Sequence, residues 1–246
     1  MGITGNVSLS LATALQRSLD VATNNIANAS TAGFKASRPI FESFVDDQQS
    51  GSSDAVSYVM DKGDYLDTTQ GPLLPTGNPL DLAVSGDGWF SYETPNGIGY
   101  GRDGRLLVNA EGLLVTASGA PILDEGGSPI TIPADSAQSI VVGKDGTIVG
   151  GNGVDLGKIG VFRILDPDKL MPIGNGLYLL PPGVSAAAPA ESAAVSQGFI
   201  EQSNVKPVVE LTQLMEIQRA YERAVTLMNQ ANDLTKRAIE RIARVV

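Results

Sequence analysis

The chain has 246 residues, with 17 lysine and arginine residues against 27 aspartate and glutamate residues and a formal net charge of −10. This length allows one large or two modest domains with a real core, and the acidic balance argues against nucleic acid or an anionic membrane as a partner. Cysteine and histidine are both absent, which excludes disulfides, thiolate metal sites and catalysis by a cysteine nucleophile or a histidine base.

The first predicted element is a helix over residues 6–30. Along it, small and apolar residues recur in alternating steps of four and three: Ser8, Ala12, Leu15, Leu19, Ala22, Ile26 and Ala29. This spacing produces one narrow stripe that suits close packing against other helices. Gly33 follows, and it predicts the end of the helix because glycine readily adopts the left-handed conformation.

Three asparagines, Asn24, Asn25 and Asn28, lie near the end of this helix, where helix propensity disfavours them. One interpretation is a frayed last turn with local side-chain hydrogen bonds. The other is that their amides form hydrogen bonds across a helix–helix contact and fix its register. Their density beside Ile26 and Ala27 favours the second interpretation.

Residues 36–79 are predicted to be an extended or loop connector after a first segment of residues 1–35. Within the connector, the small polar residues of 46–57 (DDQQSGSSDAVS) indicate a flexible loop. The loose alternation from Val56 to Leu66 is compatible with a strand.

The middle of the chain, residues 80–182, is predicted to be a β domain. Short apolar runs are divided there by turn dipeptides at Asp87-Gly88, Asp103-Gly104, Glu111-Gly112, Ser118-Gly119 and Asp145-Gly146. Such dipeptides between β-prone runs favour hairpins, so we expect a meander of short antiparallel strands. The predicted core residues are Leu82, Val84, Trp89, Phe90, Leu106, Val108, Leu114, Val115, Ile122, Ile140, Val142, Ile159, Val161 and Ile164.

The last part of the chain is predicted to be a linker over residues 183–202 and a helix over 203–246. Pro207 suits the first turn of a helix, where its missing amide hydrogen costs nothing. The helix would span about 50 Å at 1.5 Å per residue. It repeats the stepping of the first helix at Leu214, Ile217, Tyr221, Ala224, Met228, Ala231, Thr235, Ala238 and Ile242. The fold class expected is therefore a mainly β central domain flanked by N- and C-terminal α-helices that form a coiled-coil-like module.

Catalytic motifs are weak. Residues 203–206 (SNVK) match the S-x-x-K pattern of some hydrolases, but the partner motifs are missing, and Ser203 or Asn204 is better interpreted as the cap of the last helix. Acidic pairs such as Asp46-Asp47 lie in polar segments, where an ionised surface role is the default. We therefore predict a protein that is not an enzyme and has no catalytic residue, no metal and no cofactor.

An alternative of another class is a peptidoglycan-binding or hydrolytic module, with Trp89 and Asp87 in a cleft. It requires a compact pocket that contains a carboxylate of raised pKa, and activity in the middle region alone.

Three separated segments carry a resemblance to bacterial flagellar rod and hook proteins. They are residues 19–28 with 31–35 (LDVATNNIAN and TAGFK), residues 79–84 with 86–90 (PLDLAV and GDGWF), and residues 203–205 with 218–222 (SNV and QRAYE). They occur in the family's order and extend over nearly the whole chain. Within the family, the length of the chain and residues 14–17 (ALQR) are most similar to the proximal rod proteins, with the longer distal rod protein or a hook-type protein as the nearest alternative.

The resemblance implies a structural subunit of the proximal rod that transmits torque, with both terminal helices in an axial wall. It further implies export by the flagellar type III apparatus without a cleaved signal, and assembly in the periplasm. The implied partners are further copies of the chain, neighbouring rod proteins and the export apparatus, with no nucleic acid and no direct membrane insertion. The chain contains no apolar run of about 18 residues, as a membrane-spanning helix would need.

The predicted site is accordingly an assembly interface. From the first helix and the residues after it we expect Leu15, Leu19, Ala22, Asn25, Ile26, Asn28, Ala29, Gly33 and Phe34. From the last helix we expect Leu214, Ile217, Tyr221, Ala224, Met228 and Ala231. Asn25, Asn28, Gly33 and Phe34 are predicted to set the geometry with which the chain leaves the first helix. The terminal helices are expected to be disordered in the lone subunit, because a narrow stripe buries too little surface to offset the cost of ordering.

Overall fold

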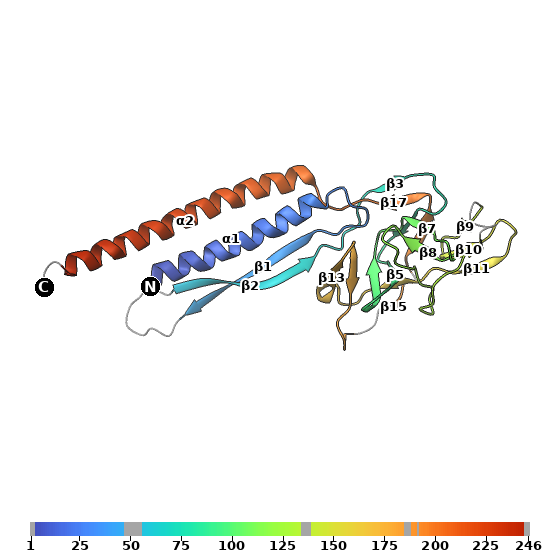
Figure 1. Cartoon of the computed structure of the whole chain (residues 1–246), viewed down its shortest axis with the longest axis horizontal. Coiled ribbons are helices and arrows are strands. Elements are labelled where there is room, and N and C mark those ends of the chain that lie inside the picture. Colours follow the sequence, from blue (N-terminus) through green and yellow to red (C-terminus); the bar gives the residue numbers. More distant parts are fainter. Residues whose placement is uncertain (1–2, 47–55, 134–138, 185–187, 191, 244–246) are drawn as a thin grey trace. The chain divides into compact units, whose positions relative to one another are not determined.

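The computed structural model describes residues 3–46, 56–133, 139–184, 188–190 and 192–243 (Figure 1). The chain forms two compact units. The helical unit comprises Met1–Ala27, Ser37–Tyr65 and Lys206–Val246, and the β unit comprises Asn28–Ala36 and Leu66–Val205. Each unit is therefore assembled from segments that are far apart in the sequence.

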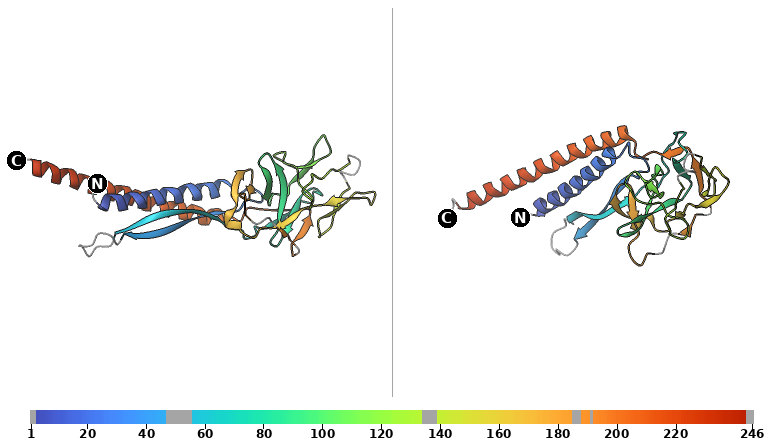
Figure 2. Two further views of the ribbon diagram at one scale, coloured as in Figure 1. Left: turned by 90° about the horizontal axis from the view of Figure 1, so that it is seen from below. Right: turned by 45° about the vertical axis from the view of Figure 1, so that its right-hand side comes forward.

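The helical unit contains two helices and a two-stranded sheet. Helix α1 spans Ile3–Ala27 and helix α2 spans Pro207–Ala243, while strands β1 (Ser37–Asp46) and β2 (Val56–Leu66) pair with each other. The helices run antiparallel and side by side in Figures 1 and 2, and α1 packs against both α2 and β1. Because α2 has 37 residues and α1 has 25, α2 is longer by about 18 Å.

Local sequence explains the helix boundaries. Pro207 occupies the start of α2, Glu210 lies in its first turn and Arg241 lies in its last turn, as favourable interactions with the helix dipole require. After α1 the chain turns with a hydrogen bond from Thr31 N to Asn28 O, and Gly33 then adopts a φ of +69°. Both predicted helices are confirmed, although α1 ends at Ala27 and not at residue 30, and α2 begins at Pro207 and not at residue 203. The strand over Val56–Leu66 is present, whereas most of the predicted loop at 46–57 lies outside the described residues.

The β unit is built from short antiparallel strands, as predicted. Its largest sheet has six strands in the order β13-β14-β6-β5-β12-β15. These are β13 (Met171–Gly174), β14 (Leu177–Leu179), β6 (Gly97–Gly101), β5 (Trp89–Thr94), β12 (Val161–Arg163) and β15 (Ala188–Pro189). A three-stranded sheet joins β11 (Asp155–Lys158), β10 (Thr147–Val149) and β9 (Val141–Val142). A 3₁₀ turn covers Pro167–Lys169.

Three two-stranded sheets also lie among the described residues of the β unit. Strand β7 (Leu106–Val108) pairs with β8 (Leu114–Thr116), β16 (Ala194–Gln197) with β4 (Leu82–Ser85), and β17 (Phe199–Glu201) with β3 (Leu73–Pro75). Strands β16 and β17 lie where a linker over 183–202 was expected. Val195 of β16 is buried and lies opposite Val84 of β4. Strand β16 was missed in the sequence because its alternating pattern is only four residues long and directly follows a stretch rich in alanine, proline and serine.

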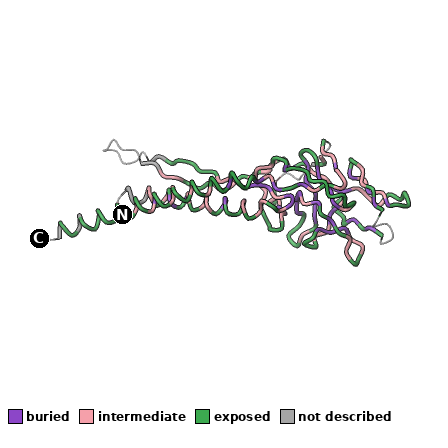
Figure 3. Tube along the Cα trace, turned by 90° about the horizontal axis from the view of Figure 1, so that it is seen from above, coloured by how far each residue is buried: buried purple, intermediate pink, exposed green. Residues whose placement is uncertain are grey.

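The core of the β unit forms around the central strands. Figure 3 shows that buried positions are concentrated there and are sparse along the helices. Of the core residues predicted from sequence, all are buried except Val108, Val142 and Val161, which are half-buried. Neither described helix is both long enough and apolar enough to cross a membrane.

Candidate assembly interface and buried ion cluster

The predicted interface residues of the helices lie on or beside the face that each helix buries within the helical unit. Ala22, Asn25 and Ala224 are buried. The remaining predicted helix positions are half-buried, namely Leu15, Leu19, Ile26, Leu214, Ile217, Tyr221, Met228 and Ala231. Half-buried residues keep surface that a further chain could cover.

The buried face of α1 differs from the predicted stripe. Besides Ala12 and Ala22 it includes Ala14, Val21 and Asn25, which lie to one side of that stripe. The physical reason is that α1 packs against both α2 and β1, whereas a heptad stripe describes contact with one partner. The side chains of Ala238 and Ile242, the last members of the α2 stripe, lie outside the described residues.

Asn25 links three elements of the helical unit. Its Oδ1 accepts a hydrogen bond from Ser37 N at 3.0 Å, and its Nδ2 donates to Ser37 O at 2.9 Å and to Glu210 Oε2 at 3.5 Å. Glu210 also pairs with Arg38, with 2.7 Å between Nη1 and Oε1. The fully buried amide therefore holds the end of α1 against the start of β1 and the first turn of α2. This geometry of Asn25 agrees with the interpretation that an asparagine amide forms hydrogen bonds across a helix–helix contact.

The other asparagines behave differently. Asn28 Oδ1 accepts a hydrogen bond from Thr31 Oγ1 at 3.2 Å, which is a local contact in the turn after α1. Asn24 is exposed on α1. The side chain of Asn28 therefore matches the first interpretation, local bonding at the helix end.

Gly33 and Phe34 belong to the β unit. A side chain at Gly33 would place its Cβ 2.3 Å from Asp103 N, and the φ of +69° disfavours other residues there. Gly33 N donates to Glu201 O at 2.8 Å, and Phe34 O accepts from Asn204 N at 3.3 Å. Ala29 and Phe34 are half-buried. The segment 28–36 is thus fastened to residues just before α2.

Where segment 28–36 meets the residues before α2, the side chains of Lys35, Arg102 and Glu201 form a buried ion cluster. Lys35 Nζ lies 2.6 Å from Glu201 Oε1, and Arg102 Nη1 lies 3.1 Å from Glu201 Oε2. The side chains of Lys35 and Glu201 are 0% exposed and that of Arg102 is 2% exposed. Glu201 Oε1 also accepts from Gly71 N at 3.0 Å, so both carboxylate oxygens are engaged.

Two cations share one carboxylate in this cluster. Desolvation lowers the pKa of Lys35, and the neighbouring carboxylate of Glu201 opposes that effect. Burial likewise lowers the pKa of Arg102, whose guanidinium donates to Gly86 O at 2.8 Å and lies 5.3 Å from the centre of the Trp89 ring. Carbonyl oxygens and the aromatic face therefore supplement the single carboxylate.

Asn204 adds a second link between the same segments. Its Oδ1 accepts from Ala36 N at 2.8 Å, while its Nδ2 donates to Asp67 O at 2.8 Å and to Thr69 O at 3.1 Å. Ser203 Oγ accepts from Val205 N at 3.2 Å, before α2 begins. The interpretation of Ser203 or Asn204 as the cap of α2 was therefore wrong, because both side chains are used ahead of the helix.

Sequence reasoning missed Lys35, Arg102, Glu201 and Glu210 altogether. The cluster residues are separated by 67 and 99 positions, so no periodic pattern could join them. Two features of the sequence could have pointed to this region. Lys35 belongs to the TAGFK segment and Asn204 belongs to the SNV segment, and both segments carry the family resemblance.

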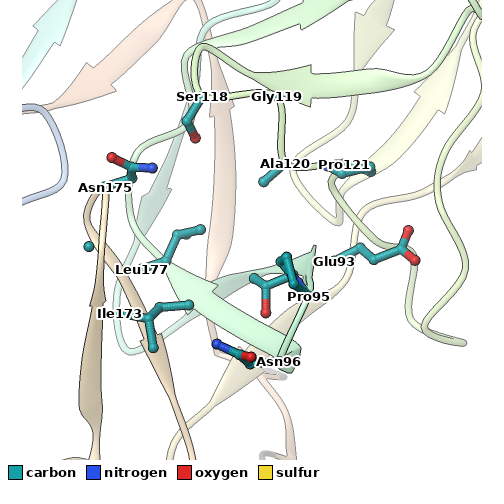
Figure 4. A pocket seen from close by; sticks show the side chains of 12 residues that line it. Glu93, Pro95, Asn96, Ser118, Gly119, Ala120, Pro121, Ile173, Asn175 and Leu177 are labelled. Atoms are coloured by element: carbon teal, nitrogen blue, oxygen red, sulfur yellow. The ribbon is translucent and has the colours of Figure 1, made fainter.

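The described openings of the β unit contain few ionisable side chains. One has a volume of about 560 Å³, and Glu93 is the ionisable side chain among the described residues that line it (Figure 4). Asp87 and Trp89 do line a second opening of about 260 Å³. However, Trp89 is 4% exposed and is packed by Arg102 and, edge-on at 5.7 Å, by Tyr178. Within the described residues, no group of three or more acidic residues is arranged to hold a metal.

Comparison with known proteins agrees with this non-catalytic geometry. The family description "Flagella basal body rod protein" matches residues 6–35, "Flagellar hook protein FlgE/F/G D1 domain" matches 83–150, and "Flagellar basal body rod FlgEFG protein C-terminal" matches 196–241. The chain is 41% identical over 245 residues to the flagellar basal-body rod protein FlgF of Caulobacter vibrioides, with 97% of each chain covered. The chain belongs to the flagellar basal-body rod protein family.

Other rod proteins extend this similarity. FlgF of Mesorhizobium japonicum is 36% identical over 95% of each chain, and FlgG of Bacillus subtilis is 33% identical over 91% of this chain and 93% of its own length. This rod protein is thus more similar to these FlgF relatives than to that FlgG relative. Each of the three family matches overlaps one of the segments that carried the resemblance in the sequence: the first covers α1 and the turn after it, the second begins in β4, and the third extends from β16 into α2.

Proposed function

We propose that this protein is a structural, non-enzymatic subunit of the flagellar basal-body rod. The observation that carries the proposal is the full-length similarity to FlgF proteins, in the same order of segments. The absence of a catalytic constellation from the sequence supports it, as does the buried, packed state of Trp89. The peptidoglycan-module alternative is not favoured.

The finer proposal is that the subunit belongs to the proximal rod and transmits torque through contacts made by its terminal helices. The interface would use the half-buried residues Leu15, Leu19, Ile26, Leu214, Ile217, Tyr221, Met228 and Ala231 together with further exposed positions of the same helices. In this arrangement α1 and α2 would act as a coiled-coil-like module in the wall of the rod. Asn25, Ala22 and Ala224 would keep the two helices of one subunit together.

The location and partners follow from the family. We propose that the subunit is exported by the flagellar apparatus, reaches the periplasm and contacts copies of itself and neighbouring rod proteins. A distal rod or hook-type position is the competing proposal, and the lower identity to the FlgG relative argues against it.

A deletion and complementation experiment tests the function. Cells that lack this chain should be non-motile, with basal bodies in electron micrographs that lack a complete rod. An epitope-tagged copy should restore motility and should co-purify with basal bodies. As a matched control, the tagged variant Glu111→Gln, altered at an exposed turn, should behave as wild type. Intact rods and normal motility in the deleted cells would contradict the proposal.

A further inference from the structure

Helix α2 carries an apolar stripe on the side that faces away from its buried face. Val208, Leu211 and Met215 recur in steps of three and four, which places them on one face of the helix. They are 77%, 48% and 51% exposed. None of them belongs to the stripe predicted from the heptad pattern, so they are a second apolar surface on the same helix. Contiguous exposed apolar side chains of this kind mark contact sites.

The helical unit also contains a groove between α1 and α2, which the described residues leave open. The groove has a volume of about 430 Å³, and its apolar wall includes Leu9 of α1 with Tyr221, Val225 and Met228 of α2. Asp20 and Asp61 also line the groove. Arg17 lines it as well, and its guanidinium pairs with Asp64 and with Asp61, so the acidic groups of the lining outnumber its one cation.

The stripe and the groove match in polarity and charge. From Val208 to Met215 the stripe covers seven helical steps, about 10 Å, and the α1 side of the groove covers eleven steps from Leu9 to Asp20, about 16 Å, so the stripe is short enough to lie within the groove. The stripe is apolar, as is the groove wall. The exposed Lys206, two residues before Val208, provides a positive charge to meet the acidic residues of the groove.

A chain cannot place its own stripe in its own groove. Met215 and Val225 are both in α2, ten helical steps and about 15 Å apart along one rigid axis. We therefore propose that the Val208–Met215 stripe of one copy docks in the groove of a second copy, with Lys206 near Asp20 of that copy. This inference rests on the proposed function and specifies which surface meets which.

The contact joins two different surfaces, so it is heterologous. Each copy that uses its stripe on one neighbour still offers its groove to the next, and such contacts propagate as rings or helical filaments and do not close as two-fold dimers. A rod requires that property. The buried Ala22, Asn25 and Ala224 then hold each subunit together, while the exposed stripe of α2 meets the groove that includes Tyr221 and Met228 of the next copy.

Disulfide trapping tests the contact, because the chain has no cysteine of its own. A full-length Met215→Cys/Val225→Cys variant is expressed in place of the wild type, and basal bodies are isolated and mildly oxidised. A disulfide requires Cα atoms within about 7 Å, so a bond between these positions within one chain is excluded. We expect a ladder of dimers and larger multimers under non-reducing conditions, at least tenfold above either single variant.

The matched control is Met215→Cys/Leu227→Cys, since Leu227 is also in α2 and similarly exposed but does not line the groove. A wild-type-like thermal transition of each variant shows that it folds. If the folded double variant is incorporated into basal bodies without a ladder, or if Met215→Cys alone gives the dimer, the proposed contact is wrong and the rod function stands. If the wild-type chain itself is absent from basal bodies, the proposed function fails.

Charge reversal provides a second readout. Lys206→Glu should lower the amount of chain in basal bodies about fivefold, and adding Asp20→Lys should restore most of it. Equal loss in the single and double variants would contradict the pairing of Lys206 with Asp20.

Discussion

The two units of this rod protein differ in how much of their apolar surface and buried charge is covered or paired within one chain. The β unit closes a core in which Leu82, Phe90 and Ile122 are almost fully buried, and it pairs the buried cations Lys35 and Arg102 with Glu201. Both units expose large apolar side chains, but the two hydrophobic clusters of buried residues in the described chain lie in the β unit. The helical unit exposes Leu9, Leu11, Ile40, Phe41, Phe44, Met60, Leu211, Met215, Leu227 and Leu234. We propose on this ground that the β unit is stable in one copy and that the helical unit is completed by other chains.

The largest expected effect breaks the β unit at its ion cluster. Glu201→Gln leaves Lys35 and Arg102 buried without a carboxylate, which should lower the free energy of unfolding by about 3 to 5 kcal/mol. Urea unfolding followed by the fluorescence of Trp89, the single tryptophan, reports on this unit. Glu125→Gln, which removes an exposed pair with Lys158, is the control and should change stability by less than about 1 kcal/mol. A change of that small size for Glu201→Gln would show that the cluster does not hold the unit together.

The next effect breaks the helical unit and spares the β unit. Ala224→Glu introduces a carboxylate at a fully buried position of α2 and should destabilise the helical unit by about 2 to 4 kcal/mol, because the charge has no partner there. Rods should be missing and motility lost, while the transition seen by Trp89 fluorescence is unchanged. Glu222→Gln, at an exposed position on the same helix, is the control. Normal motility in Ala224→Glu cells would count against a packed helix pair.

The sequence predicts the division into a helical part and a β part, but it does not predict the side-chain contacts that hold each unit together. The heptad steps located both helices, and the turn dipeptides located the β domain, because periodicity and turn chemistry are local properties. The cluster of Lys35, Arg102 and Glu201 depends on tertiary closure, which brings both ends of the β unit together. The heptad pattern also could not show that α1 has two neighbours, so the predicted stripe misses Ala14 and Val21.

Alkaline pH sharpens the comparison, because buried tyrosines are confined to the β unit among the described residues. Burial raises the pKa of Tyr178 to about 12 from an ordinary value of 10.0. The folded form therefore keeps a proton that the unfolded chain releases. The contribution of Tyr178 to the free energy of unfolding is complete below pH 10 and is lost as pH rises towards 12. The loss amounts to at most about 2.7 kcal/mol.

Tyr178→Phe should accordingly weaken the fall in unfolding free energy between pH 9 and 12, measured by urea titrations at each pH. Tyr65→Phe, at an exposed position of β2, should leave that fall unchanged. Equal slopes for Tyr178→Phe and wild type would contradict the assignment.

The smallest expected effect concerns Asn25. Asn25→Ala removes the partners of Ser37 N and Ser37 O, which should cost about 1 to 2 kcal/mol in the helical unit. Circular dichroism at 222 nm, which reports on the two helices, should show a lower melting temperature, while Thr23→Ala at an exposed position of α1 serves as the control. An unchanged melting temperature would mean that the junction of α1 and β1 does not depend on this amide.

Hydrogen exchange on the purified monomer and on isolated basal bodies tests the central claim most directly. In the monomer, amides of residues 7–27 and 208–243 should exchange at least 100-fold faster than those of the central strands β4, β5 and β6, because the helical unit lacks its neighbours. In basal bodies the helical amides should become as protected as the strands. Equal protection of both units in the monomer, with no gain on assembly, would contradict the account, since the helical unit would then be complete in a single chain.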